Sequence, residues 1–164
     1  MGLKTQTRKA TDKASPSDWT NLRVPTDARI LIVCDDDSIT ERLHTAFREA
    51  GFISECAKSI TAACESARSG RFHVVVTTPV LRDGSWRRLV DIADHYDLGF
   101  VIVLIASAFD FNQWGEALQD GAFDVLDALH ELPKAAEAAR RALWAAYLKG
   151  SGPGPEAASP SRAA

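Results

Sequence analysis

Short apolar runs alternate with amphipathic stretches through the middle of this chain. The apolar runs predict strands over 29–34, 52–56, 72–77, 100–106 and 122–126. Between them, apolar residues recur every three or four positions, as Ile39, Leu43 and Phe47 do, and this spacing marks one face of an α-helix. The pattern therefore predicts strands and helices in strict alternation.

Local signals set the expected ends of several elements. Ser38 with Glu41 three residues later reads as a capping box, with Ser38 as the N-cap of the first helix. Gly51 is expected at the C′ position that ends this helix. The Asp83-Gly84 pair predicts a turn, and Pro133 is expected to open the last helix.

Strands that alternate with helices indicate an α/β fold: a doubly wound, five-stranded parallel sheet with helices on both faces. The run 100–106 is almost wholly apolar and is expected to be central. In such sheets, ligands bind at the carboxyl ends of the strands. Asp35, Asp36 and Thr78 follow the first and third predicted strands, so we expect them to lie there together.

Composition divides the 164 residues into one domain and two tails. The domain is expected over 28–149, with a flexible arm at 1–27 and a disordered tail rich in Gly, Pro, Ser and Ala at 150–164. Within the arm, Trp19 stands out as a group that could fold back onto the domain or contact a partner.

Charge and hydropathy exclude several classes of function. A net charge of -3 gives no electrostatic reason to expect nucleic acid or an anionic membrane as a partner. The longest apolar run is too short to span a bilayer, and no secretory signal is visible, so we expect a cytoplasmic protein. Cys34, Cys56 and Cys64 are expected to be buried thiols, not metal ligands.

Several segments in order resemble the receiver domain of bacterial two-component response regulators. They are ILIVCDDDS (30–38), GF (51–52), SGRFHVVV (69–76), LRDGSW (81–86) and ALQDGAFDVL (117–126). The resemblance covers 28–149 and implies the (βα)5 flavodoxin-like, or CheY-like, fold.

The resemblance also implies roles for particular positions. In that family, two acidic residues and one aspartate hold Mg²⁺, and the aspartate accepts a phosphoryl group from a histidine kinase. Here Asp35 and Asp36 match the acidic pair, but Thr78 stands at the phosphoacceptor position. The family's switch threonine or serine, its aromatic residue and its lysine are replaced or displaced; these positions hold Ala106 or Ser107, Val125 and Ala128.

These departures predict a pseudo-receiver that keeps the fold and has lost the phosphorylation chemistry. A threonine hydroxyl without a base is a poor nucleophile, and two carboxylates would bind Mg²⁺ only weakly. We therefore expect no enzyme activity and no required cofactor. The Thr78 hydroxyl is expected to hydrogen-bond to Asp35 or Asp36, although both carboxylates are also compatible with simple solvated positions at a helix N-terminus.

The expected function is protein contact within a two-component pathway. The partner would be a histidine kinase, a regulator or another receiver, with a homodimer as one form. Phe109, Phe111 and Trp114 are candidate interface residues, while core packing of Trp114 and Trp144 is the alternative. A second hypothesis keeps a receiver that binds phosphoryl groups or Mg²⁺ and is phosphorylated by an unusual route. A cofactor at the strand ends ranks last, because no glycine-rich phosphate loop is present.

Overall fold

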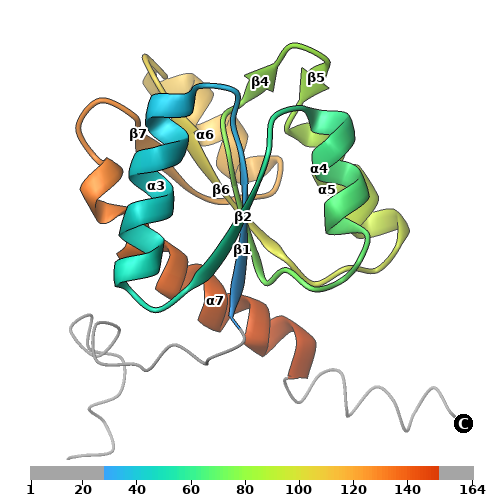
Figure 1. Ribbon diagram of the computed structural model, residues 1–164. Helices are drawn as coiled ribbons and strands as arrows, with labels where there is room; N and C mark the ends of the chain where they lie inside the picture. Colours follow the sequence, from blue (N-terminus) through green and yellow to red (C-terminus); the bar gives the residue numbers. More distant parts are fainter. Residues whose placement is uncertain (1–27, 152–164) are drawn as a thin grey trace, which may run out of the picture.

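A five-stranded parallel sheet with helices on both faces forms the protein (Figure 1). The computed structural model describes residues 28–151. The strands of the sheet are β1 (Arg29–Val33), β2 (Ile53–Ala57), β3 (Val74–Thr77), β6 (Val101–Ala106) and β7 (Ala122–Asp127). The main helices are α3 (Asp37–Glu49), α4 (Ile60–Ala67), α5 (Arg87–His95), α6 (Phe111–Gln119) and α7 (Ala135–Ser151). The strand order β2-β1-β3-β6-β7 confirms the predicted doubly wound fold.

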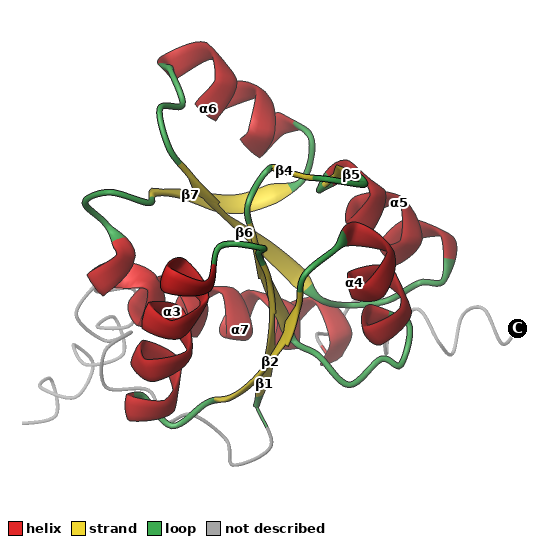
Figure 2. Cartoon of the chain, turned by 45° about the horizontal axis from the view of Figure 1, so that its top comes forward, coloured by secondary structure: helices red, strands yellow, loops and turns green. Residues whose placement is uncertain are grey.

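Alternation along the buried strands creates two apolar cores. Ile30 and Ile32 of β1 pack in the core beneath α3 and α7, whereas Leu31 and Val33 pack beneath α4, α5 and α6. Figures 1 and 2 show α3 and α7 on one face of the sheet and α4 and α5 on the other. Successive side chains point to opposite faces of a strand, so a strand covered on both faces is apolar throughout.

Some details of the topology differ from the prediction. The apolar strand β6 is fully buried in the interior of the sheet, between β3 and β7, as predicted, although the middle position belongs to β3. A small antiparallel hairpin of β4 (Val80–Leu81) and β5 (Gly84–Ser85) surrounds the predicted turn. The last helix is preceded by a 3₁₀ turn, η1 (Leu132–Lys134), which contains Pro133.

Helix α3 begins two residues earlier than its sequence suggests. Asp36, not Ser38, is the N-cap, because Asp36 has an extended backbone and its carboxylate accepts hydrogen bonds from the N–H groups of Ser38 and Ile39. At the other end, Gly51 has a φ of 94°, the left-handed conformation that favours glycine, and the prediction for this helix end is confirmed.

Two of the three thiols are buried as expected, and one is not. Cys34 and Cys64 lie in the interior, but Cys56 is exposed. Cys56 belongs to β2, an edge strand with one uncovered side, so the prediction of a buried thiol was wrong there. Within 28–151, no helix combines the length and the apolar character needed to cross a bilayer. Helix α7 runs to Ser151, so the predicted tail at 150–164 begins two residues too early. The rest of that tail and the predicted arm at 1–27, with Trp19, lie outside the described residues.

Candidate functional site

The carboxyl ends of β1 and β3 bring together the residues that the sequence singled out. The two strands are parallel neighbours, and the Thr78 N–H donates to the Val33 C=O at 3.1 Å. Asp35 and Asp36 follow β1 directly, and Thr78 follows β3. The main chain therefore places the acidic residues and the threonine at one edge of the sheet, where parallel α/β folds bind ligands.

Two of the three acidic residues at this edge already have structural roles. Asp36 Oδ1 accepts hydrogen bonds from the Ser38 N–H at 2.9 Å and the Ile39 N–H at 3.2 Å. Asp37 forms an ion pair with Lys58, and this hydrogen bond raises the pKa of the Lys58 ammonium. Asp35 is left exposed. Across residues 28–151, no three His, Cys, Asp or Glu side chains are grouped so that they could hold a metal ion.

The Thr78 hydroxyl does not bind the acidic pair. Its Oγ1 is buried and has no hydrogen-bond partner among the residues that the structure describes. The expected bond to Asp35 or Asp36 is absent because the Asp36 carboxylate turns towards the first turn of α3. The neighbouring Thr77 hydroxyl is satisfied locally and donates to the Thr78 C=O at 2.8 Å. Position 78 thus holds a buried hydroxyl that is unpaired within the described part of the chain.

The other positions that the resemblance singled out lie towards the carboxyl ends of β6 and β7, and most of them are apolar and buried. Ala106, Val125 and Ala128 are buried, while Ser107 is exposed. The Ala128 N–H donates to the Ala106 C=O at 2.9 Å, which keeps the two methyl groups on adjacent chain segments. Neither a hydroxyl nor an ammonium group occupies these buried positions. A cavity of about 380 Å³ lies beside them, under α6.

A small polar network follows β7 and was not foreseen from the sequence. Asp127 accepts hydrogen bonds from the His130 ring at 2.8 Å and from the Leu129 N–H at 3.0 Å. The His130 bond is the main reason that the pKa of Asp127 is lowered. Glu131 accepts from the Asp127 N–H at 2.8 Å. These carboxylates order the loop where the family lysine would stand.

Exposed aromatic rings mark helix α6. Phe111 is 82% exposed and Trp114 is 40% exposed. Their rings stack with centroids 6.0 Å apart and planes 17° from parallel. Phe109 is half-buried and packs against the core, and Trp144 is also half-buried. Phe111 and Trp114 therefore form a surface patch, as the interface hypothesis expected, whereas Phe109 packs partly in the core.

Asp83 ties the β4–β5 hairpin to helix α4. Its two carboxylate oxygens accept hydrogen bonds from the Ile60 N–H at 2.8 Å and the Thr61 N–H at 2.9 Å, at the helix N-terminus. These backbone donors, Ile60 first, lower the pKa of Asp83 to about 2. The sequence showed Asp83 only as a turn residue, since a cap supplied by a segment 22 or 23 positions away leaves no local pattern.

An Asp83→Asn variant is expected to lose stability at neutral pH but not in strong acid. The folded-state pKa lies below the reference value of 3.8, so the charged cap stabilises the fold above about pH 4. That contribution is lost as the pH falls from about 4 through the folded-state pKa of about 2, because below that pKa both states bind the proton. Thermal unfolding of both proteins between pH 2 and 7 measures this. Asp91→Asn on the exposed face of α5 is the control, and a pH-independent difference would contradict the assignment.

Solved structures with similar folds are numerous. A CheY-like response regulator receiver domain protein from Methanospirillum hungatei is 19% identical with a TM-score of 0.66, and the match covers 75% of this chain and 98% of that one. The signal receiver domain of an HD domain-containing protein from Pseudomonas fluorescens is 18% identical with a TM-score of 0.67, covering 78% and 95%. The non-phosphorylated HemR receiver domain from Leptospira biflexa is 22% identical with a TM-score of 0.63, covering 71% and 94%.

The chain has the CheY-like receiver fold. No protein-family model matches the sequence, and no curated protein matches it. The likeness is thus one of three-dimensional structure at low sequence identity, and it extends over nearly the whole length of the receiver domains compared. The receiver fold places Thr78 at the end of the middle strand.

Proposed function

We propose that this receiver fold serves two-component signalling through protein contact, without an aspartyl phosphate. The observation that carries the proposal is that a threonine, Thr78, and not an aspartate, follows β3. Thr78 offers an unpaired hydroxyl there, and no carboxylate replaces it, since Asp83 is committed to the N-terminus of α4. A hydroxyl without a neighbouring base is a weak nucleophile, and its phosphoester would lack the lability of an acylphosphate.

The groups that would support phosphoryl transfer are also missing or engaged. Asp36 caps α3, and Ala128 supplies a buried methyl group where the receiver family has a lysine. A phosphoryl group at Thr78 would therefore meet carboxylate charge with no buried cation beside it. Mg²⁺ binding through Asp35 and Asp36 would be weak and is not required for the proposed function.

The proposed contact surface is the aromatic pair on α6, Phe111 and Trp114. Large exposed aromatic side chains are uncommon on isolated domains and are enriched in protein interfaces. The partner would be a histidine kinase, a regulator or a second receiver in the cytoplasm, including another copy of this chain. Regulation would then depend on the availability of the partner.

Intact-mass spectrometry tests the loss of chemistry. After incubation with Mg²⁺ and phosphoramidate, the wild-type chain is expected to show no added phosphoryl mass, while a conventional receiver treated in parallel gains one. A base-labile gain in mass would overturn the proposal. It would favour the alternative, a receiver that still accepts a phosphoryl group by an unusual route.

A Phe111→Ser variant is expected to fold normally and lose partner binding. The ring is 82% exposed, so its loss should change the free energy of unfolding by less than about 0.5 kcal/mol. Urea titration measures the stability, and sedimentation measures self-association and binding of histidine kinase fragments. Leu148→Ser is the matched control, since Leu148 is 65% exposed on α7. Equal binding by wild type and Phe111→Ser would exclude α6 as the contact surface.

A further inference from the structure

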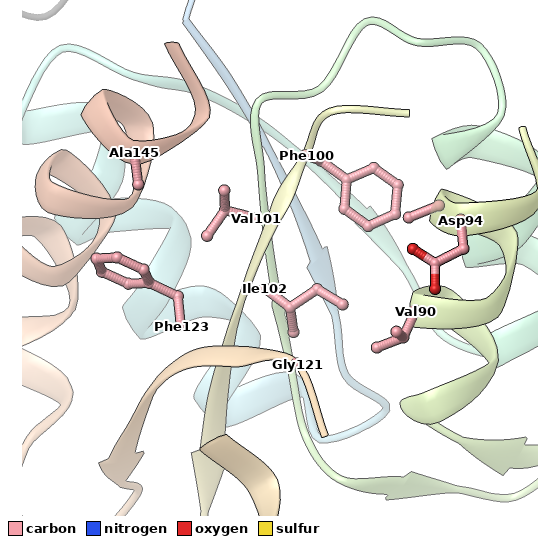
Figure 3. Close-up of a pocket in the computed structure, with 9 residues that line it drawn as sticks. Val90, Asp94, Phe100, Val101, Ile102, Gly121, Phe123 and Ala145 are labelled. Carbon is pink, nitrogen blue, oxygen red and sulfur yellow. The ribbon is translucent and has the colours of Figure 1, made fainter. Parts of the chain in front are cut away.

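A second cavity lies at the amino end of the sheet, away from Asp35 and Thr78. It measures about 280 Å³ and is bounded by α5, β6, β7 and α7. Figure 3 shows Val90, Phe100, Val101, Phe123 and Ala145 around it. These side chains are apolar, and Phe123 is 37% exposed. The cavity is therefore an apolar recess that is open to an occupant.

The backbone beside this cavity also has an uncovered edge. Strand β7 begins with Ala122 opposite Ile102, so the chain before Ile102 has no strand beside it on that side among the described residues. On its other side, Val101 is held by the His73 C=O, which accepts from the Val101 N–H at 3.0 Å. Only Val101 of β6 precedes this pairing, so an occupant would be held mainly by the apolar side chains of the recess.

One charged group lies in the cavity wall. Asp94 lines it from α5, and Figure 3 shows its carboxylate beside Phe100 and Val90. Asp94 makes no ion pair with any residue that the structure describes. An occupant with apolar side chains and a nearby cation would match both the recess and its charge.

We propose that this cavity binds the 19–24 segment of the same chain, Trp-Thr-Asn-Leu-Arg-Val. The segment combines apolar Trp19, Leu22 and Val24 with the cation Arg23. In this arrangement its apolar side chains fill the recess, and Arg23 pairs with Asp94. The cavity lies at the opposite edge of the sheet from Asp35 and Thr78. This inference does not depend on the proposed function.

The connection is long enough for this arrangement. The described chain starts at Ala28, at the amino end of β1, and only β3 separates β1 from β6. Strands β1 and β6 are therefore two strand spacings, or about 10 Å, apart. Leu22 stands six positions before Ala28, and an extended chain spans about 20 Å over six positions. Both Leu22 and Trp19 can therefore reach the cavity without displacing a strand.

The C-terminal residues fit the cavity less well than the 19–24 segment does. Residues 152–164 read GPGPEAASPSRAA and contain no large apolar side chain. That tail offers little to fill a recess lined by Phe100 and Phe123. The remaining occupant, a second copy of the chain, is distinguished by its dependence on protein concentration.

Timed trypsin digestion of the full-length chain tests the proposal, with cleavage sites read by mass spectrometry. A docked segment protects its own peptide bonds, so cleavage after Arg23 is expected to be about tenfold slower than cleavage after Lys13. Leu22→Ser should remove this protection, and Leu3→Ser, in the same arm, should not. Equal cleavage rates after Arg23 and Lys13 in the wild type would overturn the proposal.

Variants of the cavity provide the complementary test. Ala145→Leu narrows the recess from α7, and Asp94→Asn removes its charge; both are expected to speed cleavage after Arg23, whereas Asp91→Asn on the same helix is not. Asp94 is exposed, so its substitution leaves the core intact and keeps the test valid even if Ala145→Leu folds poorly. If cleavage after Arg23 stays slow in both variants, the 19–24 segment binds somewhere other than this cavity. Protection that falls on dilution would assign the cavity to a second copy, and either result refutes the inference.

Discussion

Mg²⁺ affinity is expected to rise at least about tenfold in a Thr78→Asp variant, because Mg²⁺ affinity follows the number of carboxylate ligands. The substitution puts a third carboxylate at the sheet edge that already carries Asp35 and Asp36. Without the cation, the variant should be less stable than the wild type, since the new charge is partly buried and repelled by its neighbours. Calorimetric titration with Mg²⁺, together with thermal unfolding in the presence and absence of the ion, measures both effects.

Thr78→Val is the matched control for this experiment. It keeps the shape of the side chain and removes a hydroxyl that has no partner within the described part of the chain. Removing a buried polar group that has no hydrogen-bond partner does not destabilise the folded state and can stabilise it. The free energy of unfolding of the variant should therefore equal that of the wild type or exceed it by up to about 1 kcal/mol. Mg²⁺ should have no effect on this variant. If Thr78→Asp gains no affinity for Mg²⁺, the three positions do not form one site.

The Trp86→Ala variant is expected to lose about 3–5 kcal/mol of stability, a large share of what a domain of this size possesses. Trp86 is only 1% exposed and packs in the core beneath α4 and α5. The main-chain N–H of Trp86 donates to the Pro79 C=O at 2.9 Å, and the substitution leaves this bond in place, so the expected loss comes from the buried indole. Urea unfolding followed by circular dichroism gives the loss directly.

Trp114→Ala provides the control for this loss. The chemical change is the same, but Trp114 is 40% exposed on α6 and its loss leaves no closed cavity. The expected cost is therefore below about 1 kcal/mol. Similar losses for the two variants would mean that α6 packs more tightly than its exposure indicates, and would weaken the assignment of the aromatic patch as a contact surface.

Most of the fold was readable from the sequence because its strands are buried on both faces. Runs such as Val101–Ala106 are apolar without alternation, and the helices between them carry a regular apolar stripe. Glycine at the end of α3 was also predictable, since the left-handed conformation at Gly51 favours a residue without a side chain. The same pattern could not give the hairpin of β4 and β5, whose strands have two residues each.

The candidate site was only partly predictable. Parallel strands bring their carboxyl ends to one edge, so the sequence could place Asp35, Asp36 and Thr78 near each other. It could not say which hydrogen bonds these side chains make. Asp36 caps α3 in place of Ser38, and the Thr78 hydroxyl is left unpaired because no acceptor among residues 28–151 turns towards it.

The sequence alone determined the alternating α/β architecture and the absence of a carboxylate at position 78, because both follow from residue types and their spacing. The tertiary structure alone decided which surface is exposed and which polar groups are satisfied. Cys56 is exposed because β2 is an edge strand, and Asp83 is a cap because the hairpin crosses the start of α4. Such contacts join segments far apart in the chain, and their energy depends on packing geometry that no local pattern records.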